Sequence, residues 1–140
     1  MILADTSAWV EFDRATDSSV DARMTRLITE EGDLAVTEPV VMELLAGARN
    51  EDQEASLRQL LGRFPLLRFD AAGDFHAAAL VYRRCRRSGI TPRGLVDCMI
   101  AAVAWRHGAT LLTCDIDLAR VANLIGLDLD PSSIRPPDRT

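Results

Sequence analysis

Short apolar stretches alternate along the chain with longer segments of helical periodicity. The first stretch, residues 2–4 (ILA), ends at Asp5 and is followed by a helical segment that contains AWVEF. In residues 18–31 the apolar positions recur three or four residues apart, which is the period of a helix, and Gly32 ends the pattern. This alternation predicts strands that are each followed by at least one helix.

The rest of the chain continues the alternation. Strands interleaved with helices are typical of a parallel sheet that carries helices on both faces, so we expect an α/β fold. The predicted strands are residues 2–4, 34–36, 66–69, 110–113 and 127–129. The predicted helices after residue 36 are a segment capped by Thr37 that contains VVMELLAGA, residues 50–62, a segment capped by Asp70 that runs to Arg87, residues 94–107 and residues 118–125.

Length and composition suit a single domain with its own core. The chain has 140 residues, of which 48% are hydrophobic. We expect this domain to span residues 1–130 and residues 131–140 (PSSIRPPDRT) to form a mobile tail. The longest apolar runs are too short to cross a bilayer, and no basic and then apolar leader opens the chain, so we expect a cytoplasmic protein without membrane contact.

Charge and cysteine content exclude some functions. The net charge of −5 argues against nucleic-acid binding through a generally basic surface, although a local basic patch remains open. All 16 basic residues are arginine, which excludes mechanisms that need a lysine ammonium group. Three widely spaced cysteines and two histidines do not form a zinc-ligand pattern. Cys98 and Cys114 lie in apolar segments, which predicts that they are small core residues.

Acidic residues stand where a parallel sheet gathers functional groups, at the carboxyl ends of its strands. Asp5 follows the first predicted strand, and Asp115 and Asp117 follow the fourth. Asp97 lies early in an apolar helical stretch, GLVDCMIAAVAW, and Glu43 is the carboxylate of another, VVMELLAG. Taken singly, each has a structural alternative: a helix cap for Asp5, a turn for the DxD pair, an exposed position for Glu43 and a favourable helix-dipole position for Asp97.

Together these carboxylates would repel one another unless a cation lay among them. Mg²⁺ and Mn²⁺ prefer oxygen ligands from carboxylates and water, and such ions promote phosphodiester hydrolysis by activating water. A bound ion of this kind would explain how a carboxylate is tolerated in the apolar stretch around Asp97.

Three segments carry a resemblance to a known family. The segments DTSAWVE (5–11), EPVVMELLAG (38–47) and GLVDCMIAAVAWRHGATLLTCDIDLARVA (94–122) resemble the PIN-domain ribonucleases, and among them the VapC-like toxins of toxin–antitoxin pairs. The resemblance implies a three-layer α/β/α domain with a central parallel sheet of four to five strands. It also implies endonucleolytic cleavage of RNA that depends on Mg²⁺ or Mn²⁺, with an activated water as nucleophile and 5′-phosphate and 3′-hydroxyl ends on the products.

The resemblance also assigns roles to residues and partners. Family members usually form homodimers and are silenced by a cognate antitoxin protein. Hydroxyl groups that help to orient acids or water are implied at Thr6, Ser7 and Thr113. The implied catalytic and metal-binding residues are Asp5, Glu43, Asp97 and Asp115, with Asp117 matching a further acid that part of the family has.

Other sequence features leave alternatives open. The arginine run that includes Arg86 and Arg87, together with Arg93, is a candidate for RNA contact, or alternatively a solvated helix end. Trp9 and Trp105 lie in apolar helical patterns, which favours core or interface packing over base stacking. A phosphoacceptor receiver domain or a haloacid-dehalogenase-like phosphatase would need a lysine that this chain lacks. The remaining alternative is a non-catalytic PIN-like module that binds RNA or an antitoxin.

Overall fold

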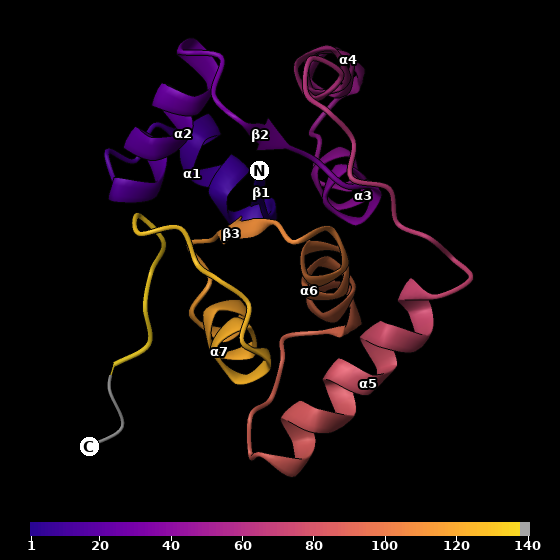
Figure 1. Ribbon diagram of the computed structural model, residues 1–140. Helices are drawn as coiled ribbons and strands as arrows, with labels where there is room; N and C mark the ends of the chain where they lie inside the picture. Colours follow the sequence, from indigo (N-terminus) through magenta and orange to yellow (C-terminus); the bar gives the residue numbers. More distant parts are fainter. Residues whose placement is uncertain (138–140) are drawn as a thin grey trace.

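Three short parallel strands form the centre of the fold (Figure 1). The computed structural model describes residues 1–137. The strands β1 (Ile2–Ala4), β2 (Leu34–Ala35) and β3 (Thr110–Leu112) are arranged in the order β2-β1-β3. Leu3 of the central strand pairs with Ala35 on one side and with Leu111 on the other. All three strands therefore point the same way, and their carboxyl ends share one edge of the sheet.

Helices cover both faces of this sheet, as the alternating pattern predicts. In Figure 1, α1 and α2 lie on one side of the strands and α3 and α6 on the other, with α5 packed outside α6. The described helices are α1 (Thr6–Arg14), α2 (Ser19–Thr29), α3 (Glu38–Ala46), α4 (Glu51–Leu61), α5 (Asp74–Arg87), α6 (Leu95–His107) and α7 (Ile116–Ile125). The parallel α/β architecture is thus confirmed.

Within residues 1–137, three of the five predicted strands are paired as strands, and the other two join the same parallel sheet only briefly. The predicted strands at 66–69 and 127–129 are each reduced to one parallel bridge, between Leu66 and Val36 and between Leu129 and Leu111. Beyond the first bridge, the backbone N–H of Phe69 donates to a side-chain oxygen of Glu38 at 2.6 Å, so this N–H does not take part in a strand ladder. Both segments extend the sheet in the predicted parallel sense but are too briefly paired to count as strands.

Two helix starts differ from the sequence prediction. The helix predicted to follow Asp70 begins at Asp74, because residues 71–73 form turns and the backbone N–H of Asp70 donates to Asp74 Oδ2 at 2.7 Å. The helix predicted at 118–125 begins two residues earlier, where the side chain of Asp115 caps it. Thr37 occupies the N-cap position of α3, but its hydroxyl makes no capping hydrogen bond.

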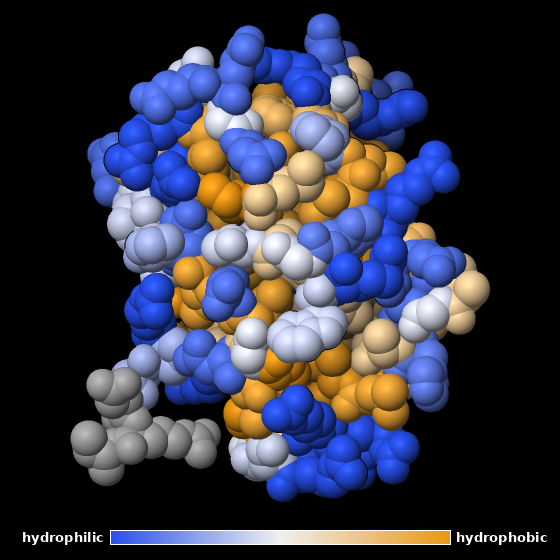
Figure 2. Space-filling view, in the orientation of Figure 1, coloured by the Kyte–Doolittle hydropathy of each residue, from blue (hydrophilic) through white to orange (hydrophobic). Residues whose placement is uncertain are grey.

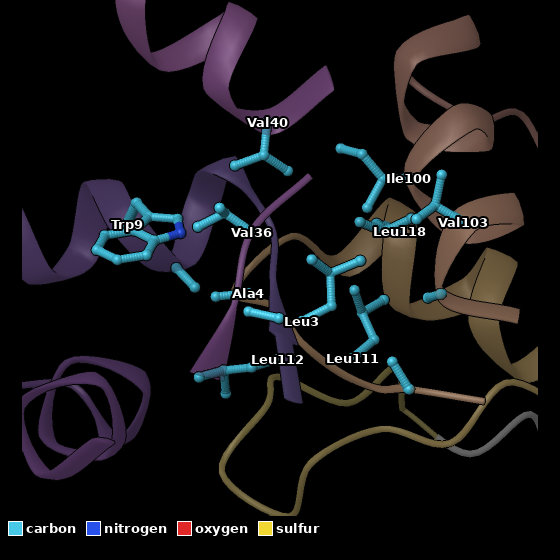
Figure 3. Packing of buried hydrophobic residues seen from close by; sticks show 14 of the residues in the cluster. Leu3, Ala4, Trp9, Val36, Val40, Ile100, Val103, Leu111, Leu112 and Leu118 are labelled. Carbon is cyan, nitrogen blue, oxygen red and sulfur yellow. The ribbon is translucent and has the colours of Figure 1, made fainter. Parts of the chain in front are cut away.

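The core lies on both faces of the strands (Figure 3). Strand residues such as Leu3 and Leu111 are completely buried, as expected for a parallel sheet covered on both faces. Trp9 packs on one side and Ile100 on the other (Figure 3). Trp9 is therefore a core residue, whereas Trp105 is 58% exposed and does not belong to the core.

The segment after residue 130 begins attached to the core. Ser133 Oγ donates to the carbonyl of Leu111 and accepts from the backbone N–H of Thr113, and the N–H of Ile134 donates to the carbonyl of Thr113. The predicted tail at 131–140 therefore starts with residues that pack along β3, while residues 138–140 lie outside the described part of the chain. Mobility of the remaining segment stays a prediction.

Polar and charged side chains surround hydrophobic patches on the face shown in Figure 2. The large hydrophobic residues that are most exposed are Leu95, Trp105, Phe75 and Met42. Within residues 1–137, no helix is long and apolar enough to cross a membrane.

Candidate functional site

Four carboxylates from four parts of the chain line one cavity of about 680 Å³. Two of them follow strands at the shared carboxyl edge of the sheet: Asp5 after β1 and Asp115 after β3. Glu43 comes from α3 and Asp97 from the first turn of α6. The structure thus brings together four of the five acids that the sequence singled out, although they are separated by up to 110 residues.

Asp5 is held rigidly by hydroxyl and amide donors. Its Oδ1 accepts from Ser7 Oγ at 2.7 Å and from the backbone N–H of Ala8 at 3.0 Å, and its Oδ2 accepts from Thr113 Oγ1 at 2.7 Å. Asp5 is therefore the N-cap of α1 and also lines the cavity, so the capping position does not exclude a place in the site. Burial raises its pKa to about 6, with a smaller contribution from Asp115, although the three donors oppose the rise.

The hydroxyl positions expected to orient acids all contact them. Thr6 Oγ1 donates to Glu43 Oε1 at 2.6 Å, which joins the start of α1 to α3. Ser7 bonds to Asp5 and also accepts from the backbone N–H of Cys114. Thr113 Oγ1 donates to Asp5 and accepts from the backbone N–H of Asp115, so it connects the two strand-end acids.

Asp97 is the least compensated of the four acids. Its Oδ2 is buried and has no hydrogen-bond partner among residues 1–137. Burial is the main reason that its pKa rises to about 7, and the charges of Asp115, Asp5 and Glu43 raise it further, while Arg93 lowers it. An ionised carboxylate without a donor is costly to bury, so a cation bound beside Asp97 would stabilise its ionised form.

Asp115 has two separate contacts. Its Oδ1 accepts from the backbone N–H of Asp117 at 2.9 Å and thereby caps α7, while its Oδ2 lies 3.6 Å from a guanidinium nitrogen of Arg93. The side chain of Asp117 instead pairs with Arg120 at 3.3 Å and does not line the cavity. The structure therefore does not bring Asp117 together with the other four acids.

Two further cavity residues carry functional groups that the sequence did not single out as part of the site. Glu11 lines the cavity as a fifth acid, and Cys114, predicted to be a core residue, lies at the cavity with its thiol donating to Glu11 at 3.2 Å. Burial and this hydrogen bond raise the pKa of Cys114 to about 11. Glu11 lies four residues after Ser7 on α1, so the helical spacing from Ser7 was the signal that could have identified it. Cys98 is fully buried, as predicted.

The arginine candidates divide into two places. Arg93 lines the acidic cavity. Arg86 and Arg87 are exposed near the end of α5 and line, with Arg83, a separate hollow of about 290 Å³. Those two arginines are therefore not part of the acidic cavity.

The donor set of the cavity fits a hard divalent cation. Carboxylate oxygens dominate it, and the unpartnered Oδ2 of Asp97 is the kind of atom that an ion would satisfy. Within residues 1–137, no three histidine, cysteine, aspartate or glutamate side chains already lie close enough together to ligate one ion. Mg²⁺ suits such an arrangement, because it keeps several waters and takes one or two carboxylates directly.

Comparisons with known proteins agree on one family. A family model described as "PIN domain" matches residues 2–124. The chain is 47% identical over 128 residues to the VapC ribonuclease Mb1587 of Mycobacterium bovis and to ribonuclease VapC11 of Mycobacterium tuberculosis, and the alignments cover 89% of this chain and 96% of each relative. The crystal structure of DNA-bound VapBC from Salmonella typhimurium shares the fold, with a TM-score of 0.71 at 20% identity over 92% of this chain and 96% of that chain.

Proposed function

This chain belongs to the PIN domain family, and we propose that its acidic cavity is the active site of an endoribonuclease. The chain is a VapC-type ribonuclease and the toxin of a toxin–antitoxin pair, in keeping with its extensive identity to VapC ribonucleases. One observation above all supports the cavity as the site: four carboxylates converge on it, and a buried oxygen of Asp97 has no partner among the described residues.

Mg²⁺ or Mn²⁺ is the proposed cofactor. Asp97, Asp115 and Glu43 are the most available ligands, because each presents a carboxylate oxygen that no hydrogen-bond donor of the described residues occupies. Asp5, whose two oxygens both accept hydrogen bonds, completes the set, directly or through water. Asp117, which pairs with Arg120, remains a candidate for a further ligand. A bound divalent ion would lower the pKa of a water molecule and screen charge on the scissile phosphate.

The chain's own side chains orient the acids for this reaction. Ser7 and Thr113 hold the Asp5 carboxylate from two sides, and Thr6 fixes Glu43. Because these donors set the carboxylate positions before substrate binds, little reorganisation is needed during the reaction. Hydrolysis by water in line with the departing 3′ oxygen would leave a 5′-phosphate and a 3′-hydroxyl. The exposed Arg86 and Arg87 are candidates for contact with RNA phosphates away from the cavity.

A protein antitoxin is the partner that follows from the VapBC likeness. We also propose that the chain forms a homodimer and acts in the cytoplasm. Dimerisation is supported by an apolar hollow of about 440 Å³ beside α5, α6 and α7, in which Leu80 and Trp105 are 46% and 58% exposed. Sedimentation of the wild type and of Leu80→Glu tests the dimer, since a buried glutamate would dissociate it.

Cleavage of a structured RNA pool tests the proposed activity. Wild type, Asp97→Asn and the control Asp128→Asn, which changes an exposed acid outside the cavity, are each incubated with Mn²⁺ and with EDTA. We expect cutting by the wild type and the control with Mn²⁺ only, and product mapping should find 5′-phosphate ends. Cutting that survives both EDTA and Asp97→Asn would refute the proposed mechanism. RNA binding without any cleavage by the wild type would favour a non-catalytic module.

A further inference from the structure

Arg93 is the one positively charged side chain among the described residues that line the acidic cavity. It stands directly before Gly94, the N-cap of α6, and so at the entrance to the helix turn that carries Asp97. Its guanidinium reaches the cavity from the rim and lies 3.6 Å from Asp115 Oδ2. The side chain itself is 74% exposed. A single cation therefore stands at the mouth of a cavity whose other charged residues are all acidic.

The contact between Arg93 and Asp115 is too weak to be explained as a structural ion pair. At 3.6 Å it makes no hydrogen bond, and water reaches the guanidinium, which is 74% exposed, so solvent screens the pair although the Asp115 side chain is only 10% exposed. Arg106 shows the contrast, because its guanidinium donates to both carboxylate oxygens of Asp74 at 2.8 and 2.9 Å, and Asp74 is almost fully buried. Most donors of Arg93 are thus left free to bind another group.

An RNA backbone that enters this cavity meets an electrostatic obstacle. Five carboxylates line the cavity, counting Glu11, and each repels the phosphates of the substrate. A bound metal ion would offset part of this charge, and a guanidinium at the cavity would offset more of it for phosphates beside the scissile one. Guanidinium groups suit this task, because their planar donors match two oxygens of a phosphate.

We propose that Arg93 binds a backbone phosphate of the RNA at the mouth of the acidic cavity and exchanges its loose contact with Asp115 for that phosphate when substrate enters. This inference rests on the proposed function of the cavity. Arg93 then contacts the substrate when RNA is bound, and in the free protein it competes with a divalent ion for Asp115. Two opposite effects follow from its removal: RNA should bind more weakly, and a divalent ion should bind more tightly.

RNA binding gives the first test. A fluorescein-labelled single-stranded RNA of mixed sequence is titrated with protein at several salt concentrations. Ca²⁺ replaces Mg²⁺ in this titration, and gels verify that the RNA stays intact. We expect Arg93→Gln to weaken binding roughly fivefold to tenfold and to lower the slope of log affinity against log salt by about 0.7 to 1, the value for one lost phosphate contact. Arg93→Lys should keep most of the slope. Arg26→Gln, an exposed arginine on α2 outside the cavity lining, should change neither quantity.

Mn²⁺ affinity, measured by calorimetry without RNA, gives the second test. Removing a positive charge 3.6 Å from Asp115 should tighten Mn²⁺ binding by roughly twofold to tenfold in Arg93→Gln. A merely structural role for Arg93 would weaken both RNA and Mn²⁺ binding, and that result would overturn the inference. If the wild type binds and cleaves RNA, an unchanged slope of log affinity against log salt in Arg93→Gln would also overturn the inference. If the wild type neither binds nor cleaves RNA, the proposed function fails, and this inference fails with it.

Discussion

Replacing Asp97 by Asn should stabilise the metal-free protein, and the gain should depend on pH. Burial and the neighbouring charges of Asp5, Glu43 and Asp115 raise the folded-state pKa of Asp97 from 3.8 to about 7, and Arg93 offsets only part of this. A carboxyl whose pKa is higher in the folded state favours folding when it is protonated. The folding stability that protonated Asp97 provides is therefore fully present below pH 4, and it is lost as the pH rises through about 7.

The size of the effect follows from the pKa change. A rise from 3.8 to about 7 spans roughly three pKa units, which at about 1.4 kcal/mol each is about 4 kcal/mol as an upper bound. Because Asp97 is half-buried in an open cavity, water screens part of this cost, and we expect about 2 kcal/mol at pH 8. For a domain of this length, that corresponds to a rise in Tm of about 6 °C.

Thermal unfolding in EDTA between pH 5 and pH 8 is the assay. The Tm of Asp97→Asn should exceed that of the wild type by about 6 °C at pH 8, and the gain should narrow to less than half at pH 5. Asp5, whose pKa of about 6 acts in the same direction, remains in both proteins and leaves a smaller common pH dependence. The control Asp128→Asn should unfold like the wild type. Equal Tm values for wild type and Asp97→Asn at pH 8 would refute this account of Asp97.

Three further outcomes are expected. Saturating Mg²⁺ should raise the Tm of the wild type by binding linkage and should have little effect on Asp97→Asn in the same thermal scan. Thr113→Val removes the 2.7 Å hydrogen bond to Asp5, so urea unfolding should show a loss of about 1 to 2 kcal/mol and RNA cleavage should fall at least tenfold, whereas Thr113→Ser should retain most of both. Arg106→Met leaves the buried Asp74 without its guanidinium, and we expect a loss of about 2 kcal/mol in urea unfolding at pH 7, discounted for the partial exposure of Arg106.

Each of these outcomes has a result that would contradict it. Equal Mg²⁺ stabilisation of wild type and Asp97→Asn would count against Asp97 as a ligand. Full activity in Thr113→Val would mean that the hydroxyl does not position Asp5. Arg106 holds the pKa of Asp74 below its ordinary value, so the stability that this pair provides is present at neutral pH and is lost as the pH falls below about 4. An Arg106→Met deficit that stayed constant through that range would therefore exclude the ion pair as its cause.

Much of the fold followed from the sequence because its signals are local. The apolar stretches at β1 and β3 are continuous, as strands buried on both faces must be, and Gly108 ends α6 with a φ of 63°, a conformation that favours glycine. The edge segments at 66–69 and 127–129 look like strands by the same local signals. In the first of them the N–H of Phe69 donates to the side chain of Glu38, a long-range contact that no local pattern contains.

The same distinction between local signals and long-range contacts applies to the residues of the candidate site. The sequence could place Asp5 and Asp115 at one edge of the sheet, because parallel strands end at the same edge, but only the structure shows that β1 and β3 are neighbours. By contrast, the exclusion of Asp117, the presence of Glu11 and the exposure of Cys114 to the cavity depended on side-chain directions. These directions are fixed by packing and by hydrogen bonds between distant segments, and residue spacing does not encode them.

By itself, the sequence determined the order of strands and helices and the identity of the acids at their ends, because periodicity and caps are properties of neighbouring residues. The tertiary structure alone decided the electrostatics of the site. Asp97 and Arg93 are only four residues apart in the sequence. Yet the pKa of Asp97 is raised by burial in the fold and then by the charge of Asp115, which follows β3, and Asp115 is also the residue with which Arg93 pairs. Charge interactions act through space, and so they are set only when the folded chain brings those segments together.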